Sequence, residues 1–307
     1  MKIWNEQDIN VTMGNKLLGC LAGGAIGDAV GSFYEGKKDV QTIEFECLNG
    51  ITDDTQLTLA TCESIIITGG VHAEDIAKRM LVWYNSGRLK GLGASTLKAL
   101  RDLQVGAHWA LSGRSGEYGA GNGAAMRIAP LAFVLDIDME RTLIRDVCNI
   151  THKNDEAYVG CLAILYALQF VIKERDLANQ GLMDYIILQL PDTSVRDNLI
   201  KLRENPLMSI REAAQLVGTS GHVVQSVPFS IFAAGKIKEA NFQDVITEVI
   251  LSGGDTDTNA SLTGQIIGAH LGMTNFSEEI KAAFNTIGES EYILQVGSEV
   301  VKVLSSR

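Results

Sequence analysis

The sequence predicts an all-α protein, and three observations support this fold class. Apolar residues recur at spacings of three and four over long segments, as in Ile76, Met80 and Tyr84, which is the periodicity of a helix with one buried face. The chain contains 4 prolines among 307 residues, so little interrupts such helices. Patterns that alternate at every second residue, which are typical of strands, are scarce.

The expected helices are bounded by ordinary helix signals. The first is rich in glycine, the second follows an acidic segment, and the second and third end at Gly69-Gly70 and at Gly87. A later helix begins after Ser209, with Glu212 at the spacing of a capping box. In order, the expected helices span residues 15–30, 53–68, 73–85, 94–105, 122–136, 139–150, 155–174, 209–217, 224–235, 241–251, 257–271 and 290–305. Irregular segments are expected at 31–51, 106–121 and 218–222.

Composition and charge exclude several classes of protein. With 46% apolar and 21% charged residues the chain is expected to fold rather than to be disordered. A net charge of -11 disfavours binding to nucleic acid or to anionic membranes. We see no apolar run of membrane-spanning length and no signal peptide, so a cytoplasmic location is expected. The 5 cysteines have no metal-ligand spacing and are expected to be reduced core residues.

The first acidic cluster is Thr52-Asp53-Asp54-Thr55, where an irregular segment meets the helix expected at 53–68. Threonine and aspartate are favoured at helix N-termini because their side chains accept hydrogen bonds from free N–H groups. Taken alone, this cluster is therefore best explained as a helix cap.

The second cluster, Ser252-Gly253-Gly254-Asp255-Thr256-Asp257-Thr258-Asn259-Ala260, repeats the same design about two hundred residues later. One cap needs one side chain, whereas this segment carries two carboxylates and three hydroxyls. If the clusters converge, each pair of like charges costs about 4 kcal/mol at an effective dielectric constant of about 20. A bound cation would remove that cost. Carboxylate and hydroxyl ligands without His or Cys suit Mg²⁺, Ca²⁺ or Mn²⁺ better than Zn²⁺.

Glycine marks two further segments. Gly19, Gly23, Gly27 and Gly31 lie four apart and would form one stripe on the first helix, where close helix packing is the simplest role. Asp28, on the same apolar helix, is expected to have a buried partner, because an isolated buried carboxylate is costly. Glu35 follows shortly after and is unremarkable by itself.

The second segment is Tyr118-Gly119-Ala120-Gly121-Asn122-Gly123-Ala124-Ala125-Met126-Arg127. It contains Gly-x-Gly-x-x-Ala, but no apolar strand precedes it, so a dinucleotide-binding turn is not expected. A glycine-rich loop that enters a helix can still present N–H groups to a phosphate. His152, within Thr151-His152, is by itself best explained as a surface or capping histidine.

Together and in this order, these segments resemble the ADP-ribosylglycohydrolase family, which includes the dinitrogenase reductase-activating glycohydrolase and the hydrolases of ADP-ribosyl-arginine and ADP-ribosyl-serine. The resemblance extends from about residue 14 to 272. Its most specific motifs are Gly-Asp-Ala-x-Gly at the end of the glycine-rich helix, Thr-Asp-Asp-Thr, Gly-Asn-Gly-Ala-Ala-Met-Arg, Thr-His, and Gly-Gly-Asp-Thr-Asp-Thr-Asn.

The resemblance implies a single compact, orthogonal multi-helix bundle over residues 1–307, with residues 1–13 as a short extension and a binuclear metal cleft. It implies two Mg²⁺ or Mn²⁺ ions and assigns their ligands to Thr52, Asp53, Asp54, Asp255, Asp257 and Thr258. It places substrate at Gly93, Ser95, Gly119, Gly121, Asn122, Gly123 and His152. Some relatives carry a functional Asp in the loop that here reads Gly91-Leu92-Gly93-Ala94-Ser95, which has none.

The function that follows is hydrolysis of the bond between ADP-ribose and a modified acceptor, with Glu35 as the favoured acid/base and Asp54 as the second catalytic candidate. ADP-ribosyl-arginine on protein is the first choice of substrate and ADP-ribosyl-serine the second. A relative that neutralises an ADP-ribosyltransferase by docking is a third possibility. The expected partners are ADP-ribosylated protein or small molecules that contain ADP-ribose, and the chain is expected to be a monomer.

Overall fold

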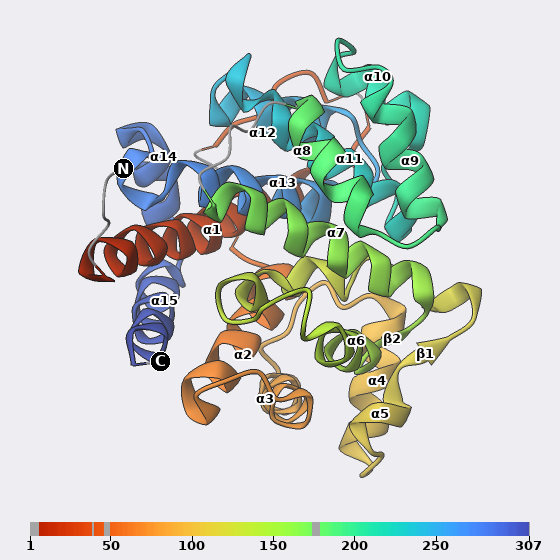
Figure 1. Ribbon diagram of the computed structural model, residues 1–307, viewed down its shortest axis with the longest axis vertical. Coiled ribbons are helices and arrows are strands. Elements are labelled where there is room, and N and C mark those ends of the chain that lie inside the picture. The colour runs from red at the N-terminus through yellow and green to blue at the C-terminus, as the bar shows by residue number, and fades with distance from the viewer. Residues whose placement is uncertain (1–5, 39, 46–49, 174–178, 307) are drawn as a thin grey trace.

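The computed structural model describes residues 6–38, 40–45, 50–173 and 179–306. Within these residues the chain forms fifteen α-helices, five short 3-10 helices and two strands of two residues each, so the all-α prediction is confirmed (Figure 1). The α-helices are α1 Glu6–Tyr34, α2 Asp53–Thr68, α3 Ala73–Asn85, α4 Ala94–Gln104, α5 Trp109–Ser112, α6 Arg141–Asn149, α7 Asp155–Ile172, α8 Asn179–Gln189, α9 Ser194–Arg203, α10 Ile210–Val217, α11 Val223–Gly235, α12 Phe242–Leu251, α13 Thr256–Leu271, α14 Glu278–Asn285 and α15 Ser290–Ser305.

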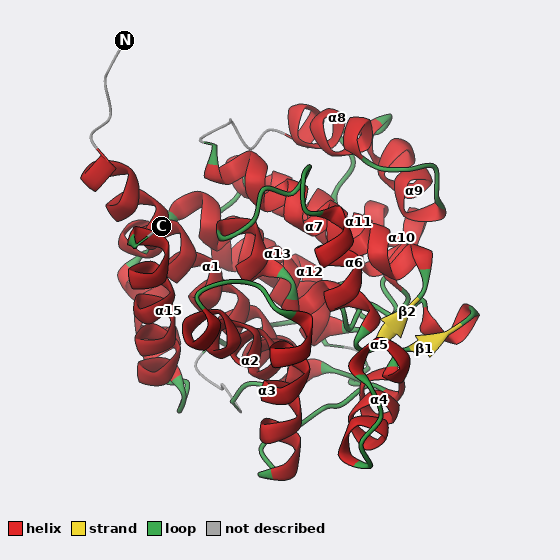
Figure 2. Ribbon diagram, turned by 60° about the horizontal axis from the view of Figure 1, so that its bottom comes forward, coloured by secondary structure: helices red, strands yellow, loops and turns green. Residues whose placement is uncertain are grey.

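The short elements lie mainly between α4 and α7. The 3-10 helices are η1 Glu117–Gly119, η2 Ala125–Arg127, η3 Ala129–Phe133, η4 Lys236–Lys238 and η5 Met273–Asn275. The strands β1 Arg114–Ser115 and β2 His152–Lys153 pair in parallel at one edge of the helical body (Figure 2).

Helices α1 and α13 pack against each other along their length at the centre of the molecule (Figure 1). The glycine stripe of α1 allows this close approach. A Cβ added at Gly19 would lie 2.2 Å from the carbonyl oxygen of Gly268, and one added at Gly23 would lie 2.2 Å from that of Gly264. Any larger residue would force the two backbones apart. The packing role predicted for these glycines is therefore confirmed.

The remaining helices cover this central pair. Helices α7, α11 and α12 pack on α13, α15 packs on α1 and α2, and α3 covers the outer side of α2 (Figure 2). The buried apolar side chains of the described residues form one hydrophobic core. Cys20, Cys62, Cys148 and Cys161 are buried in this core as free thiols, as predicted, and Cys47 lies outside the described residues.

Two helices are long and apolar enough to cross a membrane by length and composition alone: Met13–Tyr34, within α1, and Asp155–Ile172, which is α7. In the fold, 83% and 78% of their most apolar windows are buried inside the protein. Their apolar character is accounted for by their place in the core, where α1 packs on α13 and α7 packs on α11 and α13.

The segment 122–136 differs most from the predicted helix. It is broken into η2 and η3, because Gly121 and Gly123 flank its start and Pro130 opens η3. Helix α1 also continues to Tyr34, so the predicted irregular segment begins later than expected. Helices α8, α9 and α14, and the single turn α5, are absent from the predicted set.

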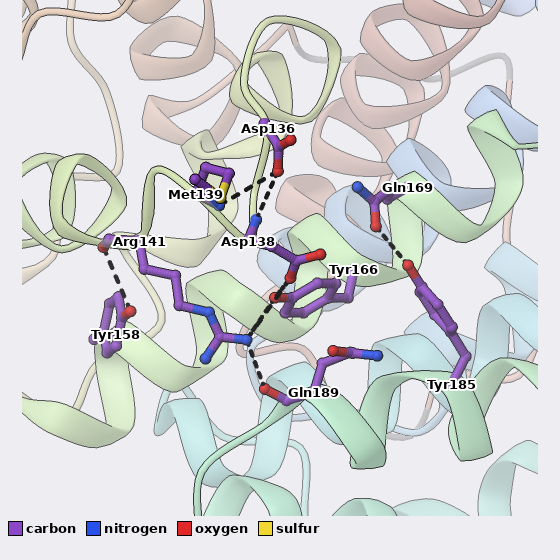
Figure 3. Close-up of polar contacts among 9 residues, drawn as sticks. All are labelled: Asp136, Asp138, Met139, Arg141, Tyr158, Tyr166, Gln169, Tyr185 and Gln189. Carbon is purple, nitrogen blue, oxygen red and sulfur yellow. Dashed lines mark hydrogen bonds and ion pairs between the residues drawn. The ribbon is translucent and has the colours of Figure 1, made fainter.

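A polar cluster ties α6, α7 and α8 together (Figure 3). The Arg141 guanidinium donates to the Tyr166 hydroxyl at 2.7 Å and to the carbonyl oxygen of Gln189 at 3.0 Å. The Tyr166 hydroxyl in turn donates to the Asp138 carboxylate at 2.6 Å. The phenol thus has both an acceptor and a donor, which is what a buried tyrosine requires.

Candidate active site

The start of α2 is held by a carboxylate from a different helix. Asp28 of α1 is fully buried and accepts hydrogen bonds from four groups, the backbone N–H and the hydroxyl of both Thr52 and Thr55. The two hydroxyl bonds are the shortest, at 2.7 and 2.6 Å. Asp28 therefore has the buried partner that the sequence predicted. Because Asp28 and the N-cap Thr52 cap this helix, the carboxylates of Asp53 and Asp54 are not needed for capping.

The two acidic clusters meet in space although about two hundred residues separate them. The Thr258 hydroxyl of α13 donates to the Asp54 carboxylate of α2 at 3.2 Å. The end of the glycine stripe permits this contact. A Cβ at Gly31 would lie 2.6 Å from the Cα of Asp257, and the Thr256 hydroxyl donates to the carbonyl oxygen of Gly31 at 2.8 Å. The predicted convergence of the two clusters is thus present in the fold.

Glu35 joins the same cluster from the end of α1. One carboxylate oxygen each from Glu35, Asp255 and Asp257 lies within 4.8 Å of the other two, a grouping suited to a metal ion. Asp255 stands at the N-cap of α13 but makes no side-chain capping bond, and it accepts instead from the Asn122 amide at 2.7 Å. Its carboxylate is thereby directed to the cluster and not to the helix.

Burial and mutual repulsion raise the pKa values of these carboxyl groups. The pKa of Asp53 rises to about 8, chiefly through burial and then through the charges of Asp28 and Asp257. Burial, followed by the hydrogen bond and the charge of Asp257, raises the pKa of Asp255 to about 8 as well. For Glu35 the largest cause of its raised pKa is the Asp257 charge, with burial second. The cluster therefore carries more negative charge than its surroundings stabilise.

The residues present fit a divalent metal. All donors in the cluster are carboxylate or hydroxyl oxygens, which are the ligands that Mg²⁺ and Mn²⁺ prefer. Asp54 Oδ1 is buried and has no hydrogen-bond partner among the described residues, which is unusual for a charged oxygen. A cation at this place would satisfy that oxygen and reverse the raised pKa values. Thr52 stands behind the cluster, where its hydroxyl donates to Asp28.

A cavity of about 400 Å³ opens above the acidic cluster. It brings together most of the residues predicted for metal and substrate, namely Glu35, Asp53, Asp54, Gly93, Ser95, Gly121, Asn122, Gly123, His152, Asp255, Asp257 and Thr258. Two predicted residues do not line it. One is Thr52, and the other is Gly119, which is buried behind the loop, where a Cβ would lie 2.4 Å from the carbonyl oxygen of Arg114.

The glycine-rich loop lies directly against His152. A Cβ at Gly121 would lie 3.1 Å from His152 Nε2, and a Cβ at Gly123 would lie 2.9 Å from its Cε1. The loop is anchored on its other side, because the Asn122 N–H donates to the carbonyl oxygen of Gly221 at 3.0 Å. Both glycines are therefore needed for the imidazole to reach this face of the cavity.

His152 is buried at 3% exposure, so its expected place at the surface is wrong. Burial, followed by the charge of Arg127, lowers the pKa of His152 to about 3. The imidazole is therefore neutral at physiological pH. The Thr-His motif gave no indication of burial, because the surrounding strand β2 is only two residues long.

The mouth of the cavity contains residues that the sequence did not indicate. Arg114 and Tyr118 both line it, and the Arg114 guanidinium lies 5.0 Å from the centre of the Tyr118 ring. Tyr118 is 77% exposed, which is high for a large aromatic side chain. The Ser95 hydroxyl fixes the neighbouring backbone by donating to the carbonyl oxygen of Tyr118 at 3.0 Å. The lining is completed by Gly91, Ala94, Thr96, Met126 and Gly221.

The chain is similar to known proteins over most of its length. The chain is 26% identical to ADP-ribosylhydrolase ARH3 of Mus musculus, with 92% of this chain and 90% of the relative covered. It is 28% identical to ADP-ribosylarginine hydrolase Tri1 of Serratia proteamaculans, with 85% and 73% covered. A solved structure described as an ADP-ribosylglycohydrolase-related protein complex has the same fold, with a TM-score of 0.69 at 22% identity over 95% of this chain and 99% of its own. The family model for ADP-ribosylglycohydrolase matches residues 10–306, and the chain therefore belongs to the ADP-ribosylglycohydrolase family.

Proposed function

We propose that this protein hydrolyses the glycosidic bond between ADP-ribose and a modified acceptor, with ADP-ribosyl-arginine on protein as the substrate. The observation that carries this proposal is the joint lining of one cavity by two acidic clusters, by the glycine loop and by His152. A sugar with vicinal hydroxyls fits the acidic part, and a diphosphate fits the glycine loop and the imidazole. Similarity to enzymes named for ADP-ribosyl hydrolysis supports the same reaction class.

In this mechanism two Mg²⁺ or Mn²⁺ ions, held by Asp53, Asp54, Asp255, Asp257 and Thr258, would orient the ribose hydroxyls and offset the negative charge of the cluster. Glu35 lies at the edge of the cavity, where it is open to solvent and close to Asp255 and Asp257. Its raised pKa suits a group that takes a proton from the attacking water and returns one to the leaving acceptor. Asp54 is the alternative base.

The carboxylates also stabilise the reaction electrostatically. Hydrolysis at the anomeric carbon develops positive charge on the sugar ring, which a carboxylate-rich pocket favours. The Asn122 amide holds Asp255 in place at 2.7 Å, and the Thr258 hydroxyl holds Asp54 at 3.2 Å. These two hydrogen bonds keep the acidic groups oriented before the substrate arrives.

Arginine is preferred as the acceptor for two reasons. A glycosylated guanidinium is already cationic, so it departs as a neutral guanidine that takes up a proton afterwards, whereas a serine oxygen must be protonated as it leaves. In addition, one of the relatives that share most of this chain's length is named an ADP-ribosylarginine hydrolase. Serine-linked ADP-ribose is the alternative substrate.

The test uses two synthetic peptides, one ADP-ribosylated on arginine and one on serine, each incubated with the protein in Mg²⁺, in Mn²⁺ and in chelator. Free ADP-ribose is measured by chromatography and mass spectrometry. We expect release from the arginine peptide that requires metal and is lost in Asp257→Asn, whereas Asp155→Asn, at an exposed carboxylate paired with Arg145, serves as the matched control. Release from neither peptide would refute hydrolysis and favour a protein that acts by docking.

A further inference from the structure

Arg127 is a buried cation without a carboxylate partner. Its side chain is 0% exposed, and its hydrogen bonds go to the carbonyl oxygens of Gly123 and Val147 and to the Thr151 hydroxyl. All three acceptors are neutral, and none of the described carboxylates forms an ion pair with it. A buried charge in such surroundings is costly, so its retention indicates a task beyond packing.

The contact between Arg127 and Thr151 determines the direction in which the Thr151 hydroxyl donates its hydrogen bond. A guanidinium only donates, so the Thr151 oxygen must accept from Arg127 Nη2 at 2.7 Å. The hydroxyl hydrogen is then free to point to His152 Nδ1, which lies 2.8 Å away. No other acceptor for this hydroxyl lies among the described residues. If Nδ1 carried a proton, the buried hydroxyl hydrogen would have no partner, which is unfavourable.

The tautomer of His152 follows from this arrangement. A neutral imidazole carries one proton, and when Nδ1 accepts from Thr151 that proton must reside on Nε2. His152 lines the cavity, and Nε2 lies on the side of Gly121 and makes no hydrogen bond to another described residue. The Nε2–H group is therefore a donor available to a ligand in the cavity.

We propose that Arg127 and Thr151 are positioning residues that fix His152 as the Nε2–H tautomer, so that a neutral imidazole donates a hydrogen bond to an anionic oxygen of the bound ligand. The part that concerns the ligand rests on the proposed function, in which that oxygen belongs to the diphosphate of ADP-ribose. The part that concerns the tautomer does not depend on any ligand.

A neutral hydrogen-bond donor suits a diphosphate that binds beside carboxylates. A diphosphate must bind in a protein of net charge -11, next to several carboxylates. A protonated histidine would be drawn toward those carboxylates, whereas a neutral donor of fixed direction serves the diphosphate at any physiological pH. The guanidinium, which forms no ion pair with a described carboxylate, adds positive potential behind the loop, and its charge offsets a small part of the rise that burial causes in the pKa of Asp53.

The first test measures the tautomer in the free protein. Protein labelled with ¹⁵N in its histidine rings is studied by NMR, and His152 is assigned by comparison with His152→Gln. We expect Nε2 to be protonated and Nδ1 to be an acceptor in the wild type, and we expect Thr151→Val to lose this preference while Thr151→Ser retains it. Thr61→Val is the matched control, because Thr61 is also fully buried but bonds only to the carbonyl oxygen of Leu57 in its own helix.

The second test measures ADP-ribose binding to the same proteins by calorimetry. We expect Thr151→Val to weaken affinity by roughly five- to tenfold, the scale of one hydrogen bond, while Thr151→Ser and Thr61→Val stay near the wild type. A wild-type protein with the proton on Nδ1, or a Thr151→Val variant with unchanged tautomer and affinity, would overturn the proposal. A wild type with the Nε2–H tautomer that neither binds nor releases ADP-ribose would support the assigned tautomer and refute the proposed function.

Discussion

The raised pKa values in the acidic cluster predict how the stability of the metal-free protein depends on pH. At pH 7 the folded protein retains protons on Asp53 and Asp255, whose pKa values are about 8, whereas the unfolded chain has already released them at a pKa of about 3.9. A folded state that binds more protons loses stability as pH rises. The metal-free protein should therefore become less stable as pH rises through 7 and 8.

The size of the effect follows from the number of protons held. Each proton retained only in the folded state changes the free energy of unfolding by about 1.4 kcal/mol per pH unit. A group with a pKa near 8 holds most of a proton at pH 7 and half of one at pH 8, so each aspartate contributes about 1 kcal/mol over this interval. The pair thus costs about 2 kcal/mol, which lowers Tm by several degrees in a chain of this size.

The assay is thermal unfolding at pH 7.0, 7.5 and 8.0, in chelator and in millimolar Mg²⁺ or Mn²⁺. We expect the fall in Tm to occur only in chelator, because bound metal takes the place of the protons and adds stability by binding the folded state alone. Asp53→Asn should reduce the fall and should be more stable than the wild type in chelator. The exposed Asp155→Asn should behave as the wild type does. A flat profile in chelator, or no gain in Tm from either metal, would refute the reasoning.

Three further predictions concern single residues. Glu35→Gln should keep the fold and most of the affinity for ADP-ribose but lower kcat by about a hundredfold or more, whereas Glu117→Gln, at an exposed site, should stay within about twofold; equal rates for both would transfer the acid/base role to Asp54. Gly31→Ala and Gly19→Ala should both lower Tm, because each Cβ would meet the backbone of α13 at 2.4 or 2.2 Å. Only Gly31→Ala should also weaken Mg²⁺ affinity in calorimetry, and equal losses would contradict this. His152→Gln should reduce the stability that the protein loses between pH 6.5 and 5. The pKa of His152 is lowered to about 3 in the folded protein, so over this range the unfolded chain takes up a proton that the folded protein does not, which favours unfolding. Urea titrations measure the free energy of unfolding, and an equal loss in the variant and the wild type would contradict this prediction.

The acidic cluster was predictable because its signal is local. Each acidic segment follows an irregular stretch and opens a helix, and each carries more carboxylates than a cap requires. Asp28 was predicted to have a buried partner for the same reason, since its place on an apolar helix is visible in the sequence. The identity of its partners, Thr52 and Thr55, could not be predicted, because this contact depends on how α1 crosses α2.

Features that depend on long-range contacts could not be predicted from the local sequence. The segment 122–136 has helical periodicity, yet the loop is held by Gly221 and by the buried Arg127, and these contacts override the local preference. The burial of His152 and the placing of Arg114 and Tyr118 at the cavity mouth arise in the same way, since residues from β1, η1 and β2 come together only in the fold. Helix α9 does carry an apolar spacing, at Val195, Leu199 and Leu202, but its charged residues obscure this pattern in the sequence.

One turn of α1 links the packing of the protein to its chemistry. Asp28 holds the first residues of α2, and Gly31, three residues later on the same helix, contacts the first residues of α13. The two acidic clusters are therefore fixed relative to each other through α1, before any metal binds. If the glycine stripe served packing alone, substitution of Gly31, its last member, would affect the site no more than substitution of Gly19, its first. Because Gly31 lies against Asp257, a shift of the helix there moves a carboxylate of the site, whereas an equal shift at Gly19 moves only the far end of α13.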